Sequence, residues 1–338
     1  MKKHLLSVVK FLVFLGLGVL LSWLAVRGLK QEDKEEILRS ISEANYVWIA
    51  LSMTVGVFAH FTRALRWKML LQPLGLNPKT SNTFYAVMIG YLGNLALPRL
   101  GEVLRCGILK RYENIPLTQS FGTVIVERVI DLIMLLLMFV LTALLQYQRM
   151  HSFLEENIFN PIKLKLHSVV ENKLMLVLLI GAAVAAIVLF FLFRKRIVQN
   201  KLVQKFIGLL NSFLQGIQTG ARVKNPLLFI FYTLFIWAMY LVTVFLCVFA
   251  FAETKTMTLS DCVVLMAMGS LGVIATPGGV GAYQWIVLQI MLLWGYSTAM
   301  GVAFGWVVWL AQTTVVVFMG LLSFALLAIG NKEPAPDP

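Results

Sequence analysis

Long apolar runs constrain the fold of this chain more than any other feature. Runs of about 20 residues, the length a helix needs to cross a hydrocarbon core, fall near 8–26, 46–65, 117–145, 174–193, 226–251 and 299–329. They are continuous rather than alternating, so they do not fit half-buried strands. Hydrophobic residues make up 59% and charged residues 13%, against roughly 45–50% and 25% in soluble domains. The sequence predicts an all-α, multi-pass integral membrane protein with one membrane domain over residues 1–338.

Two further apolar segments are interrupted by a repeated Gly/Pro motif. Residues 90–98 read GYLGNLALP, and residues 269–277 read GSLGVIATP. When the prolines are aligned, two glycines, a leucine and an alanine coincide. Because such clusters break membrane helices, residues 80–111 and 258–296 are each predicted to form a helix, a break and a second helix. Re-entrant hairpins and pairs of full crossings both remain open.

The basic residues predict which side of the membrane each loop faces. Cytoplasmic loops carry an excess of Lys and Arg. With the amino terminus inside, 19 of the 29 Lys and Arg residues fall in inner segments and nine in outer segments. We therefore expect the cell inner (cytoplasmic) membrane, with amino and carboxy termini cytoplasmic.

This orientation makes the two interrupted segments enter from opposite faces. Residues 46–145 and 226–329 are thus predicted to be repeats of inverted topology, which in transporters places a binding site near the bilayer midplane. The alternative is that the small residues only permit close helix packing. Residues 194–224 are predicted to form a cytoplasmic interfacial linker, and 331–338 a disordered tail.

Charged residues inside apolar segments are expensive and usually face protein or water. Glu127 and Asp131 are four residues apart, so they share one helical face, with Arg128 beside Glu127. Two compatible interpretations stay open. The acids bind a polar headgroup or pair with arginines of the first interrupted segment, or they form an internal salt-bridge lock.

Arginines gather around the first break, with Glu102 among them. The planar guanidinium donates two parallel hydrogen bonds to a phosphate, so Arg99 and Arg105 are candidates for phosphate recognition. Arg63 and Arg66 are further candidates, although snorkelling at the inner end of their span is the default explanation. The neighbouring tryptophan, at position 67, is interpreted as an interfacial anchor.

The second break carries no charge and is expected to offer backbone amides and carbonyls to a ligand. The residues singled out at the two breaks are Pro98, Gly101, Pro277, Gly278, Gly279, Gly281 and Gln284. Together the two breaks predict a charged inner gate and a neutral outer gate on one lipid path.

Other kinds of site are not indicated. The three cysteines and four histidines lack metal-ligand spacing, so the cysteines are interpreted as buried apolar side chains. No Walker-type phosphate loop is present. We expect no metal, no cofactor, no nucleic-acid partner and no primary active transport by this chain alone.

Several motifs carry a family resemblance over roughly residues 10–330. They are Arg63-x-x-Arg66-Trp67, Leu97-Pro98-Arg99-x-Gly101-Glu102-x-x-Arg105, Gly122-Thr123 with Glu127-Arg128-x-x-Asp131, and Pro277-Gly278-Gly279-x-Gly281. In order and chemistry they resemble the lysylphosphatidylglycerol synthase transmembrane-region family, which corresponds to the flippase-like membrane half of the multiple peptide resistance factor.

The resemblance implies that the chain moves an aminoacyl-lipid between leaflets. In the two-part proteins of the family, a soluble carboxy-terminal domain makes this lipid. The chain stops about ten residues after its last predicted span, so no aminoacyl transferase domain and no synthase activity are expected. Relatives often carry a glutamate where this chain has Gln284, which weakens an acidic outer site for a cationic headgroup.

The sequence therefore predicts a lipid flippase rather than an enzyme. Its substrate would be a phosphate-bearing or modified lipid of aminoacyl or polyprenyl type, anionic or lipid-linked, and a separate lipid-modifying enzyme is a candidate partner. The alternative is a membrane enzyme or partner subunit acting on a lipid-linked substrate, with Glu102, Glu127 and Asp131 as acid/base candidates. A third hypothesis is that the protein is a scaffold for a separate synthase. Headgroup, direction, energy coupling and oligomeric state stay open.

Overall fold

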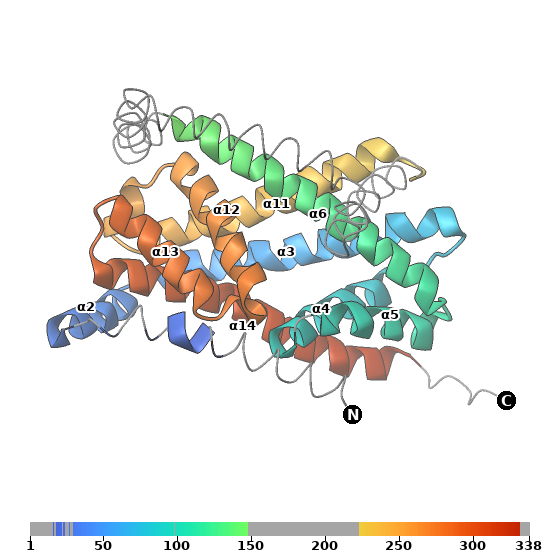
Figure 1. The fold of residues 1–338 in the computed structure, drawn as a ribbon. Coiled ribbons are helices and arrows are strands. Elements are labelled where there is room, and N and C mark those ends of the chain that lie inside the picture. Colours follow the sequence, from blue (N-terminus) through green and yellow to red (C-terminus); the bar gives the residue numbers. More distant parts are fainter. Residues whose placement is uncertain are drawn as a thin grey trace, which may run out of the picture.

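The computed structural model describes residues 30–97, 99–147 and 223–331, with a few positions between 16 and 27. These residues form helices and contain no strand (Figure 1). The predictions that fall wholly or mostly outside the described residues are the spans near 8–26 and 174–193, the linker 194–224, Pro98 and all but the first residue of the tail 331–338.

Four long helices form the frame, namely α3 (Tyr46–Leu71), α6 (Leu117–Leu145), α11 (Pro226–Val248) and α14 (Thr298–Gly330). Helix α3 packs along α11, and α14 contacts α3. Three of the described stretches are long and apolar enough to cross a membrane, namely Tyr46–Leu74, Pro226–Val248 and Thr298–Gly330. The predicted helical class is confirmed, and the total number of spans stays a prediction.

Polar residues at the helix starts explain where several elements begin. The Asn45 and Ser297 side chains accept hydrogen bonds from Val47 N and Met300 N at the starts of α3 and α14. Thr258 and Asp261 form a capping box at the start of α12 (Leu259–Ala275). Such caps satisfy backbone N–H groups that have no partner within the helix.

The two interrupted segments form matching hairpins. The first contains α4 (Thr80–Ala96) and α5 (Leu100–Glu113), and the second contains α12 (Leu259–Ala275) and α13 (Ala282–Leu293). Helices α4 and α12 each have 17 residues and end at the alanines that coincide in the sequence repeat. The predicted pattern of helix, break and helix is confirmed in both segments.

The breaks also share a backbone conformation. Leu97 and Thr276 are extended, with φ of −144° and −130°. The residues after the two prolines, Arg99 and Gly278, are both left-handed, with φ of 66° and 61°. The sequence repeat is therefore also a repeat of local structure, while its inverted orientation in a membrane stays a prediction.

Glycines allow the two arms of each hairpin to approach closely. A Cβ atom at Gly101 would overlap the carbonyl oxygen of Gly90, and one at Gly272 would lie 2.6 Å from the Cα of Tyr283. The small residues of the motif thus do serve close helix packing, as the alternative interpretation held.

The two hairpins lie toward opposite ends of the long helices (Figure 1), and their breaks meet. A Cβ atom at Gly278 would lie 2.6 Å from Cδ2 of Leu95, near the end of α4. The indole Nε1 of Trp309 on α14 donates a 2.7 Å hydrogen bond to the Gly278 carbonyl oxygen. Helix α14 therefore supports the contact between the breaks.

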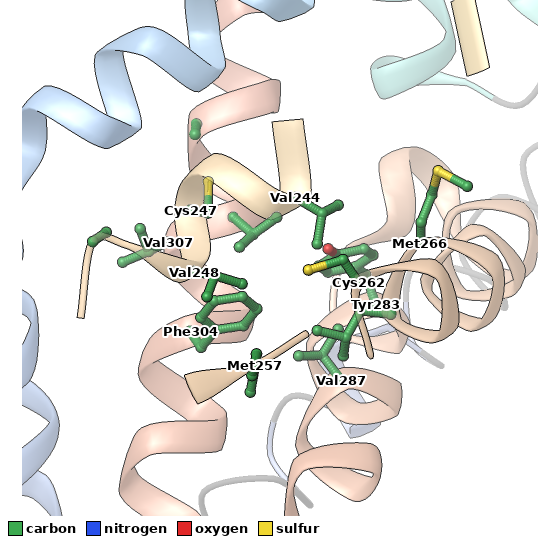
Figure 2. Close-up of a cluster of buried hydrophobic side chains, with 14 of the residues drawn as sticks. Val244, Cys247, Val248, Met257, Cys262, Met266, Tyr283, Val287, Phe304 and Val307 are labelled. Carbon is green, nitrogen blue, oxygen red and sulfur yellow. The ribbon is translucent and has the colours of Figure 1, made fainter. Parts of the chain in front are cut away.

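The second hairpin packs in a large apolar core with α11 and α14. Figure 2 shows Cys247, Cys262 and Phe304 among its members, and all three are fully buried. The third cysteine, Cys106, is also buried, and none of the three is in a disulfide. The prediction of buried apolar thiols is confirmed.

Some short elements were not predicted. Helix α2 (Gln31–Ser42) occupies the expected loop between the first two spans and packs on α14, where Ser297 Oγ donates to Glu36 at 3.1 Å. Asn331, the first residue of the predicted tail, is tied to Asn82 by hydrogen bonds of 2.9 and 3.0 Å. The short 3-10 turns are η1 (Gln72–Leu74), η3 (Glu253–Thr256) and η4 (Pro277–Gly279).

The matching breaks predict that Arg99→Gly stabilises the protein. A non-glycine residue in the left-handed region costs about 1–2 kcal/mol, and part of this gain is lost to the greater freedom of glycine when unfolded. We expect a gain of about 0.5–1 kcal/mol, measured as a higher melting temperature in detergent. Arg99→Gln keeps the strain and should leave stability unchanged. A lower melting temperature for Arg99→Gly would contradict the prediction.

Candidate functional site

A cluster of five charged side chains lies between three helices beside the first break. Arg63 and Arg66 come from α3, Arg105 from α5, and Glu127 and Asp131 from α6. The three arginines and Glu127 are at most 4% exposed, and the Asp131 side chain is 15% exposed. Buried charges are stable only when paired, so the contacts among these residues decide what the cluster can do.

Each acid contacts two or more arginines. Glu127 Oε1 accepts from Arg63 Nε at 2.7 Å, and Glu127 Oε2 accepts from Arg105 Nη2 at 2.8 Å. Asp131 Oδ1 accepts from Arg66 Nη2 at 2.7 Å, and its other oxygen accepts from Arg63. Glu127 and Asp131 therefore share a face that binds arginines, as the interpretation of an internal salt-bridge network expects, and headgroup binding by the two acids stays a prediction.

Aromatic and hydroxyl groups make further contacts with the arginines of the charged cluster. Arg63 Nη1 donates to the Tyr240 hydroxyl at 3.0 Å, and the Arg105 guanidinium lies 4.5 Å from the Trp67 ring centroid, a cation–π distance. Trp67 Nε1 in turn donates to Thr123 Oγ1 at 2.9 Å. Helices α3, α5, α6 and α11 all contribute.

The cluster carries an excess of positive charge, because three arginines face two carboxylates. Arg66 Nε and Arg105 Nε are buried and have no hydrogen-bond partner among the described residues. An unpaired buried N–H of a cation is costly, so the cluster is chemically suited to accept one further anionic oxygen.

A small cavity and a more exposed ion pair lie next to the cluster. Arg128 Nη2 donates to Glu102 Oε1 at 2.8 Å, with the Arg128 side chain 42% exposed. Arg105 and Arg128 both line a cavity of about 10 Å³ that also touches Asn94 and Gly101 at the break. That volume suits about one water molecule.

Comparison with known proteins places the chain in a family. A family model described as the lysylphosphatidylglycerol synthase TM region matches residues 7–320. The chain belongs to the lysylphosphatidylglycerol synthase transmembrane-region family. The predicted resemblance is thereby confirmed, and the chain is a member of a membrane-protein family.

Two relatives match parts of this family member. The UPF0104 membrane protein of Methanocaldococcus jannaschii is 28% identical over 133 residues, 38% of this chain and 36% of the relative. Glycosyltransferase AglD of Haloferax volcanii is 30% identical over 102 residues, 30% of this chain and 16% of the relative. The matches span well under half the length of these relatives. No solved structure matches the chain.

For this family member, the prediction of snorkelling at the end of the second span is wrong. Helix α3 continues to Leu71, six residues beyond the predicted end of the span. Arg63 and Arg66 therefore lie within the helix and are buried in the ion-pair cluster rather than reaching toward water. Trp67 is fully buried, so it is not an interfacial anchor.

Arg99 and Arg105, both predicted as candidates for phosphate recognition, are placed differently. Arg105 is in the cluster, whereas Arg99 is exposed at the break, and none of the ion pairs in the described part of the chain includes it. Arg99 precedes α5 at its amino-terminal end, and Arg105 lies well inside the helix. The two arginines therefore have different surroundings, although they are only six residues apart in the sequence.

The second break is less open than expected. Besides the Gly278 carbonyl bound by Trp309, Gly279 N donates to Thr276 O at 2.9 Å, and Thr276 Oγ1 donates to Val280 O at 2.9 Å. These backbone groups are used internally and are not free for a ligand. Pro277, Gly279 and Gly281 are buried. The break is neutral, as predicted, but largely closed.

Gln284 on α13 stands out among the residues of the second hairpin. Its side chain is 1% exposed, and neither amide atom has a hydrogen-bond partner among the described residues. It packs against Gly305 of α14, where a Cβ atom would lie 3.4 Å from the Gln284 Cα. It is a buried polar side chain close to the second break.

Sequence reasoning missed the contributions of α11. Thr233 and Tyr240 contact the arginines from a span whose sequence is almost entirely apolar. They are seven residues apart, which places them on one helical face. That spacing of polar groups in an apolar span was a usable signal. In the described part of the chain, no group of His, Cys, Asp and Glu side chains is arranged to hold a metal ion.

Proposed function

We propose that this protein moves an amphiphilic lipid between membrane leaflets, with a phosphate-bearing headgroup passing beside the arginine cluster. The observation that carries the proposal is the excess positive charge of a buried cluster that has unpartnered N–H donors on Arg66 and Arg105. A phosphate oxygen can accept one charge-assisted hydrogen bond from such an Nε–H group. The substrate class is a phosphate-bearing or modified lipid, of aminoacyl or polyprenyl type.

The position of the cluster supports movement rather than static binding. Arg105 follows the first break, and that break meets the second through Leu95 and Gly278. In transporters built from inverted repeats, paired broken helices surround the substrate site near the midplane. The proposal includes that arrangement for residues 46–145 and 226–329, in the cell inner membrane with cytoplasmic termini.

An incoming phosphate can compete with Glu127 for Arg105. Arg105 contacts Glu127 through one nitrogen, and Glu127 is also held by Arg63. A headgroup can therefore take Arg105 while Glu127 keeps a partner, so no buried carboxylate is left unpaired. Acyl chains would stay in the lipid during this exchange.

Reconstitution into liposomes tests the proposal. Purified protein in vesicles with a fluorescent phosphatidylglycerol should speed exchange between leaflets, followed by quenching of the outer leaflet. Arg105→Gln is expected to slow exchange about tenfold, the effect of one charge-assisted hydrogen bond. Arg111→Gln, on the same helix but exposed, should not. Exchange no faster than in protein-free vesicles across a panel of anionic, aminoacylated and polyprenyl lipids would overturn the proposal.

The name of the AglD relative favours a second candidate, an enzyme or partner subunit acting on a lipid-linked substrate. The half-buried carboxylate of Asp131 is the acid/base candidate here. Turnover of a polyprenyl-phosphate sugar by the purified protein, lost in Asp131→Asn, would favour this candidate. Absence of turnover with normal lipid exchange would exclude it.

A further inference from the structure

A buried histidine lies one helical turn from the charged cluster and has no role in the function proposed above. His60 on α3 is 7% exposed, and its ring nitrogen Nδ1 is buried without a hydrogen-bond partner among the described residues. Arg63 is three residues further along the helix, so the two side chains are neighbours on its surface. A neutral imidazole keeps one basic nitrogen, and histidine is the side chain best suited to take up a proton near neutral pH. His60 is therefore a candidate proton-binding site.

Tyr91 on α4 links His60 to the arginine cluster and to the small cavity beside the first break. The centroids of the His60 and Tyr91 rings are 4.7 Å apart. The Arg63 guanidinium lies 5.5 Å from the centroid of the Tyr91 ring. Tyr91 also lines the cavity of about 10 Å³ that Arg105 and Arg128 line, which has room for about one water molecule. His60 and the cavity thus share one neighbour, and a charge on His60 acts directly on Arg63.

Of the titratable groups described around this site, His60 is the one that can gain a proton without losing an ion pair. Glu127 and Asp131 on α6 each bind Arg63, so protonating either acid would weaken a buried ion pair. The phenols already carry their protons at neutral pH. The groups that α3 and the helices packed on it place around His60 are Arg63 (α3), Tyr91 (α4), Glu127 and Asp131 (α6) and Tyr240 (α11). The other elements that pack on α3, η1 and α14, carry no titratable residue.

We infer that His60 binds a proton when the arginine cluster binds an anion, so that one proton moves with each lipid headgroup. This inference rests on the proposed function, to which it adds the coupled ion. Three arginines and two carboxylates leave one excess positive charge in the cluster. A proton at His60 raises that excess to two charges, which is costly in a buried site, and a bound phosphate lowers it again. Each ligand therefore strengthens the binding of the other, and by linkage the two effects are equal.

Coupling to a proton determines what can drive the transport. A proton and a phosphodiester monoanion cross together without net charge, so a membrane potential does no work on the step. A pH difference does, because each pH unit is worth about tenfold in an equilibrium constant. The lipid is therefore expected to accumulate in the leaflet that faces the less acidic side, toward which the protons flow.

Proton uptake on binding tests the site. The probe is dihexanoyl phosphatidylglycerol, whose phosphodiester does not titrate near neutral pH, so protons that are taken up go to the protein. Isothermal titration calorimetry in two buffers of different ionisation enthalpy gives the number of protons taken up for each lipid bound. With the protein in phosphatidylcholine nanodiscs, we expect uptake that rises to nearly one proton within about pH 5–8. No uptake anywhere in this range would overturn the inference.

The other histidines provide matched controls. A variant in which His4, His151 and His167, all outside the described residues, are replaced by glutamine should keep the uptake. His60→Gln should lose it, and melting temperatures establish whether each variant is folded. If His60→Gln does not fold, NMR of the labelled imidazole nitrogens in the triple variant reports the protonation of His60 as the sole histidine. Uptake that persists in folded His60→Gln, or an imidazole that stays neutral with lipid bound, would overturn the inference.

Liposomes with a pH difference test the coupling to movement. A fluorescent phosphatidylglycerol should accumulate about tenfold in the leaflet on the less acidic side for a difference of one pH unit, and faster than in protein-free vesicles. A potassium diffusion potential at equal pH should produce no accumulation. Exchange that the protein accelerates but that is indifferent to the pH difference would refute the coupling and leave the transporter standing. Proton uptake without accelerated exchange would refute the transporter and the coupled movement, and keep His60 as a proton site.

Discussion

Replacing Glu127 by glutamine is expected to destabilise the protein more than any other single change of charge in the described residues. Glu127 is fully buried and binds Arg63 and Arg105 through its two oxygens at 2.7 and 2.8 Å. Glutamine would leave three buried arginines facing only Asp131. Breaking a buried ion pair by removing one partner costs about 3–5 kcal/mol. We expect a large fall in the melting temperature in detergent.

Two further variants show whether charge balance is the cause. The double change Glu127→Gln with Arg105→Gln should recover part of the lost stability, because the cluster then holds two arginines and one acid instead of three and one. Arg128→Gln removes a pair whose arginine is 42% exposed, and such pairs contribute only about 0–1 kcal/mol. If Glu127→Gln is no worse than Arg128→Gln, the cluster does not stabilise the fold.

Local features of the fold could be predicted from the sequence because the physics that sets them is local. Apolar length and Gly/Pro content gave the helical class, the limits of α6 and the two breaks. The repeat marked the position of both breaks, and the matching left-handed conformations of Arg99 and Gly278 were found only in the structure. Helical spacing also placed Glu127 and Asp131 on one face, since a separation of four residues is enough to do so.

Partners distant in sequence could not be predicted. Arg63 and Glu127 are 64 residues apart, and periodicity identifies the face of a helix without identifying what packs on it. The prediction from hydropathy also ended the second span too early, because a hydropathy scale scores every arginine as exposed to water. Burial of Arg63 and Arg66 became possible only when α6 and α11 supplied carboxylate and hydroxyl partners. For the same reason, the closed state of the second break depended on Trp309, 31 residues further along the chain.

Gly101→Ala is the second change expected to have a large effect, because it separates the arms of the first hairpin. A Cβ atom at Gly101 would overlap the Gly90 carbonyl oxygen, and it would lie 2.8 Å from Cγ of Asn94. The obstacle is backbone, so no side-chain rotation can relieve it. Overpacking of this kind costs about 1–3 kcal/mol and occasionally more. The change should also weaken the 2.8 Å hydrogen bond from Gly101 N to Asn94 Oδ1, which holds the break together.

Gly107→Ala on the same helix is the matched control. A Cβ atom there meets nothing within 4 Å, and alanine in a helix interior is favoured over glycine by about 1 kcal/mol. We therefore expect Gly107→Ala to raise the melting temperature slightly and Gly101→Ala to lower it, with slower lipid exchange in the second case because Arg105 and the cavity beside it shift with α5. If the two variants melt together, the close approach of α4 and α5 is not what sets the geometry of the break.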